Sequence, residues 1–180
     1  MTISLSVQSI DTASHPILIL DDESAVLHSL RETLERLGYT IVVSQSPLEA
    51  LEIVRDCPLS VILSDMRMPE MNGLDFLQHC EAIRPEATRV LITAMLSFSS
   101  VLQAMNSGAI FRFIPKPWEH AELLAAVKDA LAHFQLVTRT AELTGEVARL
   151  QAEGDSLRRA LTEKTHALEM LQRSFGAAVD

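Results

Sequence analysis

The sequence predicts an α/β fold: a doubly wound, five-stranded parallel sheet followed by a long C-terminal helix. Short apolar runs alternate with amphipathic stretches from residue 15 to about residue 135. These runs are nearly continuous in β-branched and aliphatic residues, as is typical of strands that are covered on both faces. The residues after 135 instead carry leucines at heptad spacing, which indicates a long helix.

Five runs have the composition of buried strands: ILIL (17–20), TIVV (40–43), SVILS (60–64), RVLIT (89–93) and IFRFI (110–114). The stretches between and after them are predicted helices, at about 23–37, 46–56, 73–84, 96–107 and 119–135. Strands and helices that alternate in this way form right-handed crossovers, which place the strands parallel and the helices on both faces of the sheet.

The ends of the predicted helices carry suitable residues. Gly38 follows the last apolar residue of the first helix and fits a C-terminal stop. Ser46 and Pro47 fit the N-cap and the first position of the second helix. Asn72 fits the N-cap of the third helix, and Gly73 marks its start.

Composition excludes several classes of protein. The chain has 180 residues, of which 48% are hydrophobic, so it can bury a core. Its net charge of −9 argues against a general nucleic-acid or membrane-surface binder. No apolar run approaches the roughly 18 residues that span a bilayer, so no membrane partner is expected. Cys57 and Cys80 form no CxxC pair and are expected to be reduced thiols of a cytoplasmic protein, and the Ser/Thr-rich residues 1–15 a flexible tail.

Polar residues follow the predicted strands at one edge of the sheet. Asp21 and Asp22 follow the first strand, Asp65 the third, Thr93 ends the fourth and Lys116 follows the fifth. Ligands of open parallel sheets bind beyond the carboxyl ends of the strands, so this edge is the predicted site.

These residue types favour phosphoryl chemistry. Neighbouring carboxylates repel one another, and a hard cation such as Mg²⁺ removes that repulsion. An unprotonated aspartate can then attack a phosphoryl group as a nucleophile. A hydroxyl and an amine can hold the oxygens of the transferred group. The edge therefore has the parts of a phospho-aspartate site.

Four motifs carry a resemblance to a known family: ILILDDE, LSDMRMPEMNGLDFL, LITA and FRFIPKPW. Together they resemble the receiver domain of two-component response regulators, over residues 16–135. The resemblance implies a flavodoxin-like (βα)₅ fold with strand order 2-1-3-4-5. It also implies a signalling module that promotes its own phosphoryl transfer and hydrolysis, and not an enzyme with a separate substrate.

The resemblance assigns the acceptor and the metal ligands. It implies that Asp65 accepts a phosphoryl group from a histidine kinase or a phosphotransfer protein, with Mg²⁺ as cofactor. Asp65 and Asp22 would bind Mg²⁺ directly, and Asp21 would bind it through water. The backbone carbonyl of Arg67 would complete the protein ligands.

The resemblance also assigns a switch. Thr93 would contact the phosphoryl group, Lys116 would pair with Asp65, and Phe113 occupies the aromatic switch position. The Lys116–Pro117 bond is expected to be cis, as is usual in the family. Pro115 should remove one N–H from the ladder of an edge strand, and the sequence shows no compensating gain.

Residues 136–175 are predicted to form a coiled coil, and residues 176–180 a short tail. The apolar heptad positions are Leu136, Leu143, Val147, Leu150, Leu157, Leu161, Leu168 and Leu171. This pattern favours a parallel homodimer. Gly154 leaves an alternative open, in which residues 153–156 break the helix into a hairpin. Mixed charge along this segment argues against direct DNA binding.

The sequence leaves open the output of the chain, whether the receiver signals, and the environment of Trp118. The motif AMNSGAIFRFIPKPW resembles the subgroup of receivers that precede HD-GYP or other HD-type output domains. The chain could therefore be the regulatory fragment of a longer cyclic-di-GMP phosphodiesterase, although it contains no HD pair or GYP triplet. It could also be a coiled-coil scaffold with a receiver that no longer signals. Trp118 could be buried at the start of the fifth helix or contact a partner.

Overall fold

The computed structural model describes residues 15–94, 105–106 and 108–176, with the backbone alone for residues 171–176. The chain divides into two units, Met1–Val137 and Thr138–Asp180. Most of the predicted flexible tail and of the predicted fourth helix at 96–107 lies outside the described residues, as do residues 177–180.

The described residues of the first unit contain one five-stranded parallel sheet in the order β2-β1-β3-β4-β5, which confirms the predicted fold. The strands are β1 (Ile17–Leu20), β2 (Ile41–Ser44), β3 (Val61–Asp65), β4 (Thr88–Thr93) and β5 (Arg112–Pro115). Asp65 pairs with Ile92 of β4, and Thr93 pairs with Pro115 of β5. The register therefore brings the carboxyl ends of β3, β4 and β5 to one edge.

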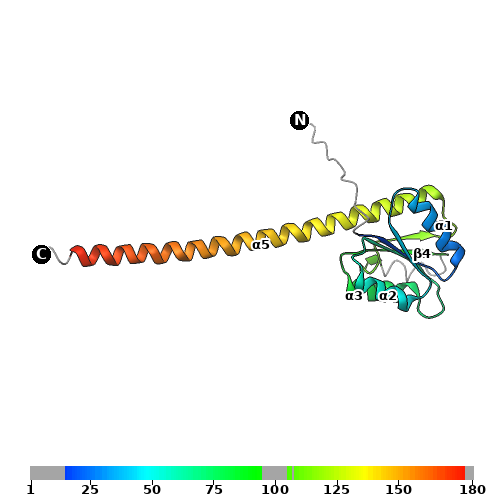
Figure 1. Cartoon of the computed structure of the whole chain (residues 1–180), viewed down its shortest axis with the longest axis horizontal. Coiled ribbons are helices and arrows are strands. Elements are labelled where there is room, and N and C mark those ends of the chain that lie inside the picture. Colours follow the sequence, from blue (N-terminus) through cyan, green and yellow to red (C-terminus); the bar gives the residue numbers. More distant parts are fainter. Residues whose placement is uncertain (1–14, 95–104, 107, 177–180) are drawn as a thin grey trace, which may run out of the picture. The chain divides into compact units, whose positions relative to one another are not determined.

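Helices cover both faces of the sheet (Figure 1). The helices in the described residues are α1 (Ser24–Glu35), α2 (Pro47–Asp56), α3 (Gly73–Ile83) and α5 (His120–Gly176). One core cluster joins the sheet to α2 and α3, around Phe76 and Leu77. The other joins it to α1 and to the start of α5, around Leu30 and Val127. The near-continuous apolar strands fit this sandwich because both of their faces are buried.

The predicted helix ends are confirmed in part. Gly38 has a positive φ of 85° after α1, and the Asn72 side chain accepts a hydrogen bond from the Asp75 N–H at 3.0 Å. Ser46 stands at the N-cap of α2, but its side chain makes no capping bond. Its hydroxyl instead donates to Glu70 at 3.1 Å, because the loop after β3 lies beside it.

The prediction that Pro115 removes an N–H from the ladder of β5 is wrong. The Lys116 N–H donates to the Thr93 carbonyl at 2.7 Å, so it points toward β4. Successive N–H groups of a strand point to opposite sides, so the Pro115 nitrogen faces the outer edge of β5. Proline therefore removes no ladder bond here. It removes a donor that an exposed edge would offer to another strand.

The C-terminal helix is continuous. Helix α5 runs from His120 to Gly176 and passes through Gly154 without a break, so the hairpin alternative is wrong. A Cβ added at Gly154 would meet no atom within 4 Å. Among the described residues nothing packs against this position, so the missing side chain leaves no cavity in the single chain. None of the helices in the described residues is long and apolar enough to cross a membrane.

Pro115→Val tests which way the Pro115 nitrogen faces. The valine N–H would point to the outer edge and gain no ladder partner, and the unfolded chain would gain conformational freedom. We expect the free energy of unfolding, measured by urea denaturation, to fall by about 0.4–1 kcal/mol. A rise would contradict this geometry, because it would mean that the new N–H had found a partner in the sheet.

Candidate functional site

Four of the predicted site residues meet at the carboxyl edge of the sheet. Asp21 follows β1, Asp65 ends β3, Thr93 ends β4, and Lys116 follows β5. Asp21, Asp65 and Thr93 are buried, with exposed fractions of 1%, 6% and 4%. Two carboxyl groups are thus placed largely out of water, which requires compensating partners.

Lys116 supplies that compensation. Its Nζ donates to Asp21 Oδ2 at 2.9 Å and forms an ion pair with Asp65 Oδ1. The Glu23 N–H donates to Asp21 Oδ1 at 2.9 Å, and the Arg67 N–H donates to Asp65 Oδ2 at 2.6 Å. Both carboxylates are therefore held by one shared ammonium and one backbone amide each.

Burial and ion pairing act in opposite directions on the pKa of Asp21 and on that of Lys116. Burial raises the pKa of the Asp21 carboxyl above its ordinary value, and the bonds from Lys116 and Glu23 only partly offset this effect. Burial lowers the pKa of Lys116, but the hydrogen bonds to Asp65 and Asp21 outweigh it, so the pKa of the amine is raised. The lysine therefore remains charged in the site.

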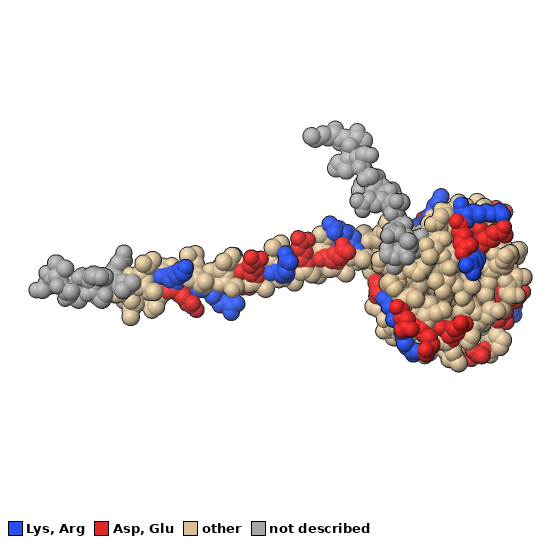
Figure 2. Space-filling view, in the orientation of Figure 1, with Lys and Arg blue, Asp and Glu red and all other residues tan. Residues whose placement is uncertain are grey.

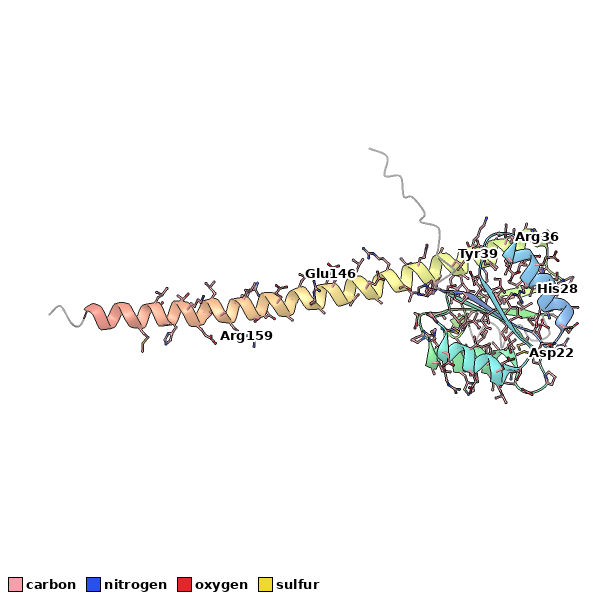
Figure 3. The ribbon with its side chains drawn as sticks, in the orientation of Figure 1. Asp22, His28, Arg36, Tyr39, Glu146 and Arg159 are labelled. Atoms are coloured by element: carbon pink, nitrogen blue, oxygen red, sulfur yellow. The ribbon has the colours of Figure 1, made fainter. Side chains whose placement is uncertain are left out.

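Asp22 stands apart from this cluster. It is exposed, and Figure 3 places it at the surface of the first unit, at the start of α1. Its backbone carbonyl accepts a hydrogen bond from the Gln45 side chain at 3.1 Å. Gln45 follows β2 and ties this loop to the neighbouring strand end, a contact that the sequence did not predict because it joins segments 23 residues apart.

Gly73, at the start of α3, lies directly against the backbone of Asp65. A Cβ at this position would lie 2.0 Å from the Asp65 carbonyl oxygen and 3.0 Å from the Met66 Cα. The Gly73 N–H donates to the Met66 carbonyl at 2.9 Å. Glycine thus lets the first turn of α3 touch the Asp65 peptide, which any side chain would push away.

The site can accommodate a hard cation. Within the described residues, no three His, Cys, Asp or Glu side chains form a ready-made metal cluster. Mg²⁺ does not need one, because it binds through one or two carboxylates and keeps several waters. Asp21 and Asp65 face one ammonium at the same edge and provide such oxygens, and the Arg67 backbone is bonded to Asp65 two residues before it. The residues therefore fit Mg²⁺.

Phe113 lies on β5, where it pairs with Leu91, two residues before Thr93. It is half-buried and lines a groove of about 520 Å³ that is bordered by Met105, Arg112, Pro115 and Glu122. Its ring therefore packs against the core cluster of α2 and α3 on one side and lines this groove on the other. Trp118 is half-buried against the cluster of α1 and α5, which favours the burial alternative. The Lys116–Pro117 peptide bond is cis, as predicted.

Lys116→Met tests how the site holds two buried carboxylates. The change leaves Asp21 without its ammonium, and breaking a buried pair from one side costs about 3 kcal/mol. A carboxyl whose folded pKa is raised adds stability below its unfolded pKa of 3.8 and loses it as the pH rises through the folded pKa. The variant should therefore be weakest at neutral and alkaline pH.

The measurement is urea unfolding at pH 5 and pH 8, with and without Mg²⁺, beside Lys128→Met, an exposed lysine on α5. We expect Lys116→Met to lose more stability between pH 5 and pH 8 than the wild type or Lys128→Met, and to regain more of it with Mg²⁺ than the wild type gains. Equal pH profiles for the two variants would contradict this account of the site.

Comparison with known proteins identifies the family. The family model of the response regulator receiver domain matches residues 17–128. The transcriptional regulatory protein ZraR of Klebsiella oxytoca is 32% identical over 120 residues, which cover 67% of this chain and 27% of ZraR. The chain thus matches about a quarter of the length of this curated relative.

Solved structures agree. One is the adenylate cyclase from Rhodopirellula baltica, with a TM-score of 0.69 and 31% identity over 72% of this chain and 96% of that chain. Another is the signal receiver domain of an HD domain-containing protein from Pseudomonas fluorescens Pf-5, with a TM-score of 0.66 and 29% identity over 75% of this chain and 98% of that chain. The chain therefore belongs to the response regulator receiver domains of two-component systems.

Proposed function

We propose that this receiver accepts a phosphoryl group on Asp65 from the phosphohistidine of a histidine kinase or a phosphotransfer protein. The observation that carries the proposal is the Lys116 ammonium, which contacts both Asp65 and Asp21 at the carboxyl edge of the sheet. A lysine placed there neutralises charge on the acceptor and remains close enough to contact a phosphoryl oxygen.

The proposed transfer is a nucleophilic displacement at phosphorus. An Asp65 carboxylate oxygen forms the new P–O bond while the P–N bond to the donor imidazole breaks. The imidazole leaves with the electron pair and takes up a proton from water. Lys116 and the Thr93 hydroxyl hold oxygens of the transferred group, where its negative charge must be stabilised.

Mg²⁺ would be held by Asp65, Asp22 and the Arg67 carbonyl, with Asp21 acting through water. When bound, it neutralises negative charge between the carboxylates and the phosphoryl group. This assignment would require Asp22 to turn toward the site from its exposed position, while Lys116 would keep its bond to Asp21. The hard oxygens of Asp21 and Asp65 support this assignment.

The signal would leave through Thr93 and Phe113. A phosphoryl group that engages Thr93 pulls on the end of β4, to which Lys116 is bonded through its backbone. Phe113 can respond because it borders the groove along β5 and α5. The change would bias the face formed by the predicted fourth helix, β5 and the start of α5, and would reach the coiled-coil segment because α5 continues into it.

The C-terminal helix would act as a parallel, homodimeric coiled coil. Its heptad residues are exposed in the single chain, at 45% to 68%: Leu136, Leu143, Val147, Leu150, Leu157, Leu161 and Leu168. Acidic and basic side chains are interspersed along this helix (Figure 2). A regular apolar stripe of this length needs a partner, and an identical stripe on a second copy supplies one.

Charge favours the parallel arrangement. In a parallel pair, Glu153 at position g faces Arg158 at position e of the second copy. In an antiparallel pair centred near Gly154, g faces g, so the two Glu153 carboxylates would face each other. The parallel pair therefore gains an attraction where the antiparallel pair has a repulsion.

The similarity to the receiver of an HD domain-containing protein favours a second candidate function. The 180 residues would then be the regulatory fragment of a longer cyclic-di-GMP phosphodiesterase or other HD-type protein. A scaffold with a non-signalling receiver is less well supported, because Asp65, Thr93 and Lys116 are all present and adjacent. We place the chain in the cytoplasm, where Cys57 and Cys80 remain free thiols, and expect no direct DNA contact from its mixed-charge helix.

Asp65→Asn tests the phosphoryl acceptor. The variant should take up no phosphoryl group from acetyl phosphate with Mg²⁺, because an amide is not a nucleophile at phosphorus. Intact mass spectrometry measures the added phosphoryl group. Asp56→Asn, at an exposed position at the end of α2, is the matched control and should label like the wild type. Equal labelling of Asp65→Asn and the wild type would refute the assignment.

Leu161→Asp tests the coiled coil. Sedimentation equilibrium at tens of micromolar should give a dimer for the wild type and a monomer for Leu161→Asp, because the charge falls in the apolar seam. Met170→Asp is the matched control. Met170 is 57% exposed and Leu161 68% exposed in the single chain, but Met170 lies off the seam and its variant should remain a dimer. A wild-type monomer would overturn the coiled-coil proposal.

A further inference from the structure

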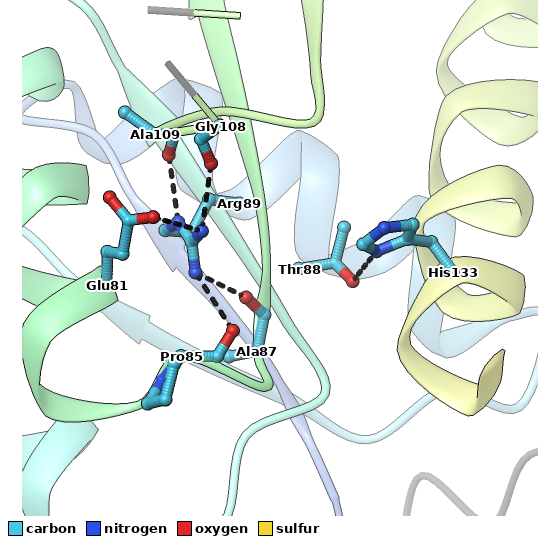
Figure 4. A network of polar contacts seen from close by, with 8 residues as sticks. All are labelled: Glu81, Pro85, Ala87, Thr88, Arg89, Gly108, Ala109 and His133. Carbon is cyan, nitrogen blue, oxygen red and sulfur yellow. Dashed lines mark hydrogen bonds and ion pairs between the residues drawn. The ribbon is translucent and has the colours of Figure 1, made fainter. Parts of the chain in front are cut away.

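Arg89 is a buried cation that the proposed phosphoryl chemistry does not use. It lies on β4, four residues before Thr93, and is only 8% exposed. Its guanidinium is surrounded by carbonyl oxygens, as Figure 4 shows: it donates to Ala109 at 2.8 Å, Ala87 at 3.0 Å, Gly108 at 3.1 Å and Pro85 at 3.3 Å. It also pairs with Glu81 of α3 at 3.3 Å.

These carbonyls come from two turns. Pro85 and Ala87 belong to the turn that leads into β4, and Gly108 and Ala109 belong to the turn that leads into β5. One side chain therefore ties the entrances of two neighbouring strands to each other and to α3. The planar fork of arginine suits this task, because it offers donors in several directions at once.

The strand that Arg89 anchors is the one that carries Lys116. β5 has four residues, and in the described part of the chain it pairs on one side alone, with β4. A short edge strand is held by few ladder bonds, so its position depends on what holds its ends. At its carboxyl end, Lys116 bonds to Thr93 through its backbone and to Asp65 through its amine.

We propose that Arg89 is a positioning residue of the phosphorylation site, which fixes the entrance of β5 on β4 and thereby keeps the Lys116 amine on Asp65. The proposal rests on the proposed function for its consequence, but its geometry lies wholly in the first unit. Methionine at this position would fill the space and leave the carbonyls without a donor, so the entrance of β5 would loosen first.

Arg84 provides a matched control. Its guanidinium also binds backbone carbonyls, of Val54 at 3.0 Å and Arg55 at 3.1 Å, and pairs with Glu86 at 3.2 Å. These contacts tie the end of α2 to the end of α3 and do not involve the turn before β5. Arg84→Met therefore removes a similar set of bonds without releasing β5.

The experiment compares Arg89→Met and Arg84→Met in the full chain by amide hydrogen exchange. In Arg89→Met we expect residues 112–116 to exchange at least tenfold faster relative to β1, and the affinity for beryllofluoride with Mg²⁺ to fall at least fivefold. In Arg84→Met we expect the exchange rate of residues 112–116 relative to β1 to stay as in the wild type. The affinity for beryllofluoride with Mg²⁺ should change less than twofold.

Unchanged protection of residues 112–116 in Arg89→Met, or equal acceleration in both variants, would overturn the proposal. If Arg89→Met does not fold, Arg89→Lys decides by the same readouts, because lysine keeps the charge but cannot reach both turns as a fork. A wild-type chain that binds no beryllofluoride would contradict the proposed function, while the exchange rates would still test whether Arg89 anchors β5.

Discussion

The site depends on the burial of two carboxyl groups beside one ammonium. Asp21 and Asp65 are nearly inaccessible to water, and an unpaired buried carboxylate is strongly unfavourable. Lys116 makes their burial tolerable, because its amine reaches both. That arrangement requires the parallel sheet, whose strand order places β1 beside β3 and brings the end of β5 within reach across β4. The fold therefore serves chiefly to bring distant parts of the sequence to one charge-balanced edge.

The charge of the site is not fully neutralised, and the remaining charge favours the binding of a cation. Two acidic groups share one cation, so the edge keeps a residual negative charge that favours a divalent metal. Under the proposed function, the arrival of a phosphoryl group adds negative charge and changes the partners of Lys116 and Thr93. A ligand shifts a conformational equilibrium only by interacting differently with its two states. Such a difference would arise if the Lys116 ammonium exchanged a carboxylate partner for the phosphoryl group. Phe113 lies on β5, the strand that Lys116 follows, so the exchange could reach it.

The sequence predicted the fold well because its signals are local or periodic. The apolar runs, the helix faces, Gly38 and Asn72 each act through neighbours in the chain, whereas the strand order was implied by the resemblance to receiver domains. The sequence also named Asp21, Asp65, Thr93 and Lys116, which meet at the edge, but it grouped with them Asp22, which stands apart. It did not predict that Lys116 would hold Asp21 as well as Asp65, that Gly73 would touch the Asp65 peptide, or that Arg89 would bind two turns. Each of these depends on contacts between segments that are distant in sequence. Arg89 in particular resembles an ordinary polar residue in a strand, since its partners are backbone carbonyls, which every residue has.

Helix α5 has two separate apolar faces, one buried in the receiver core and one exposed along the C-terminal segment. Its buried positions in the first unit include Val127, Leu131 and Phe134, and its exposed apolar stripe begins at Leu136. Two residues turn a helix by about 200°, so Phe134 and Leu136 lie on nearly opposite faces. The exposed stripe is therefore not a continuation of the face that folds the receiver. Water penalises exposed leucines, and the core clusters of the described residues form without them, so the stripe supports the proposed partner outside the single chain. A helix that served only as a spacer would be expected to carry charged and polar residues at these positions, as it does on its other faces.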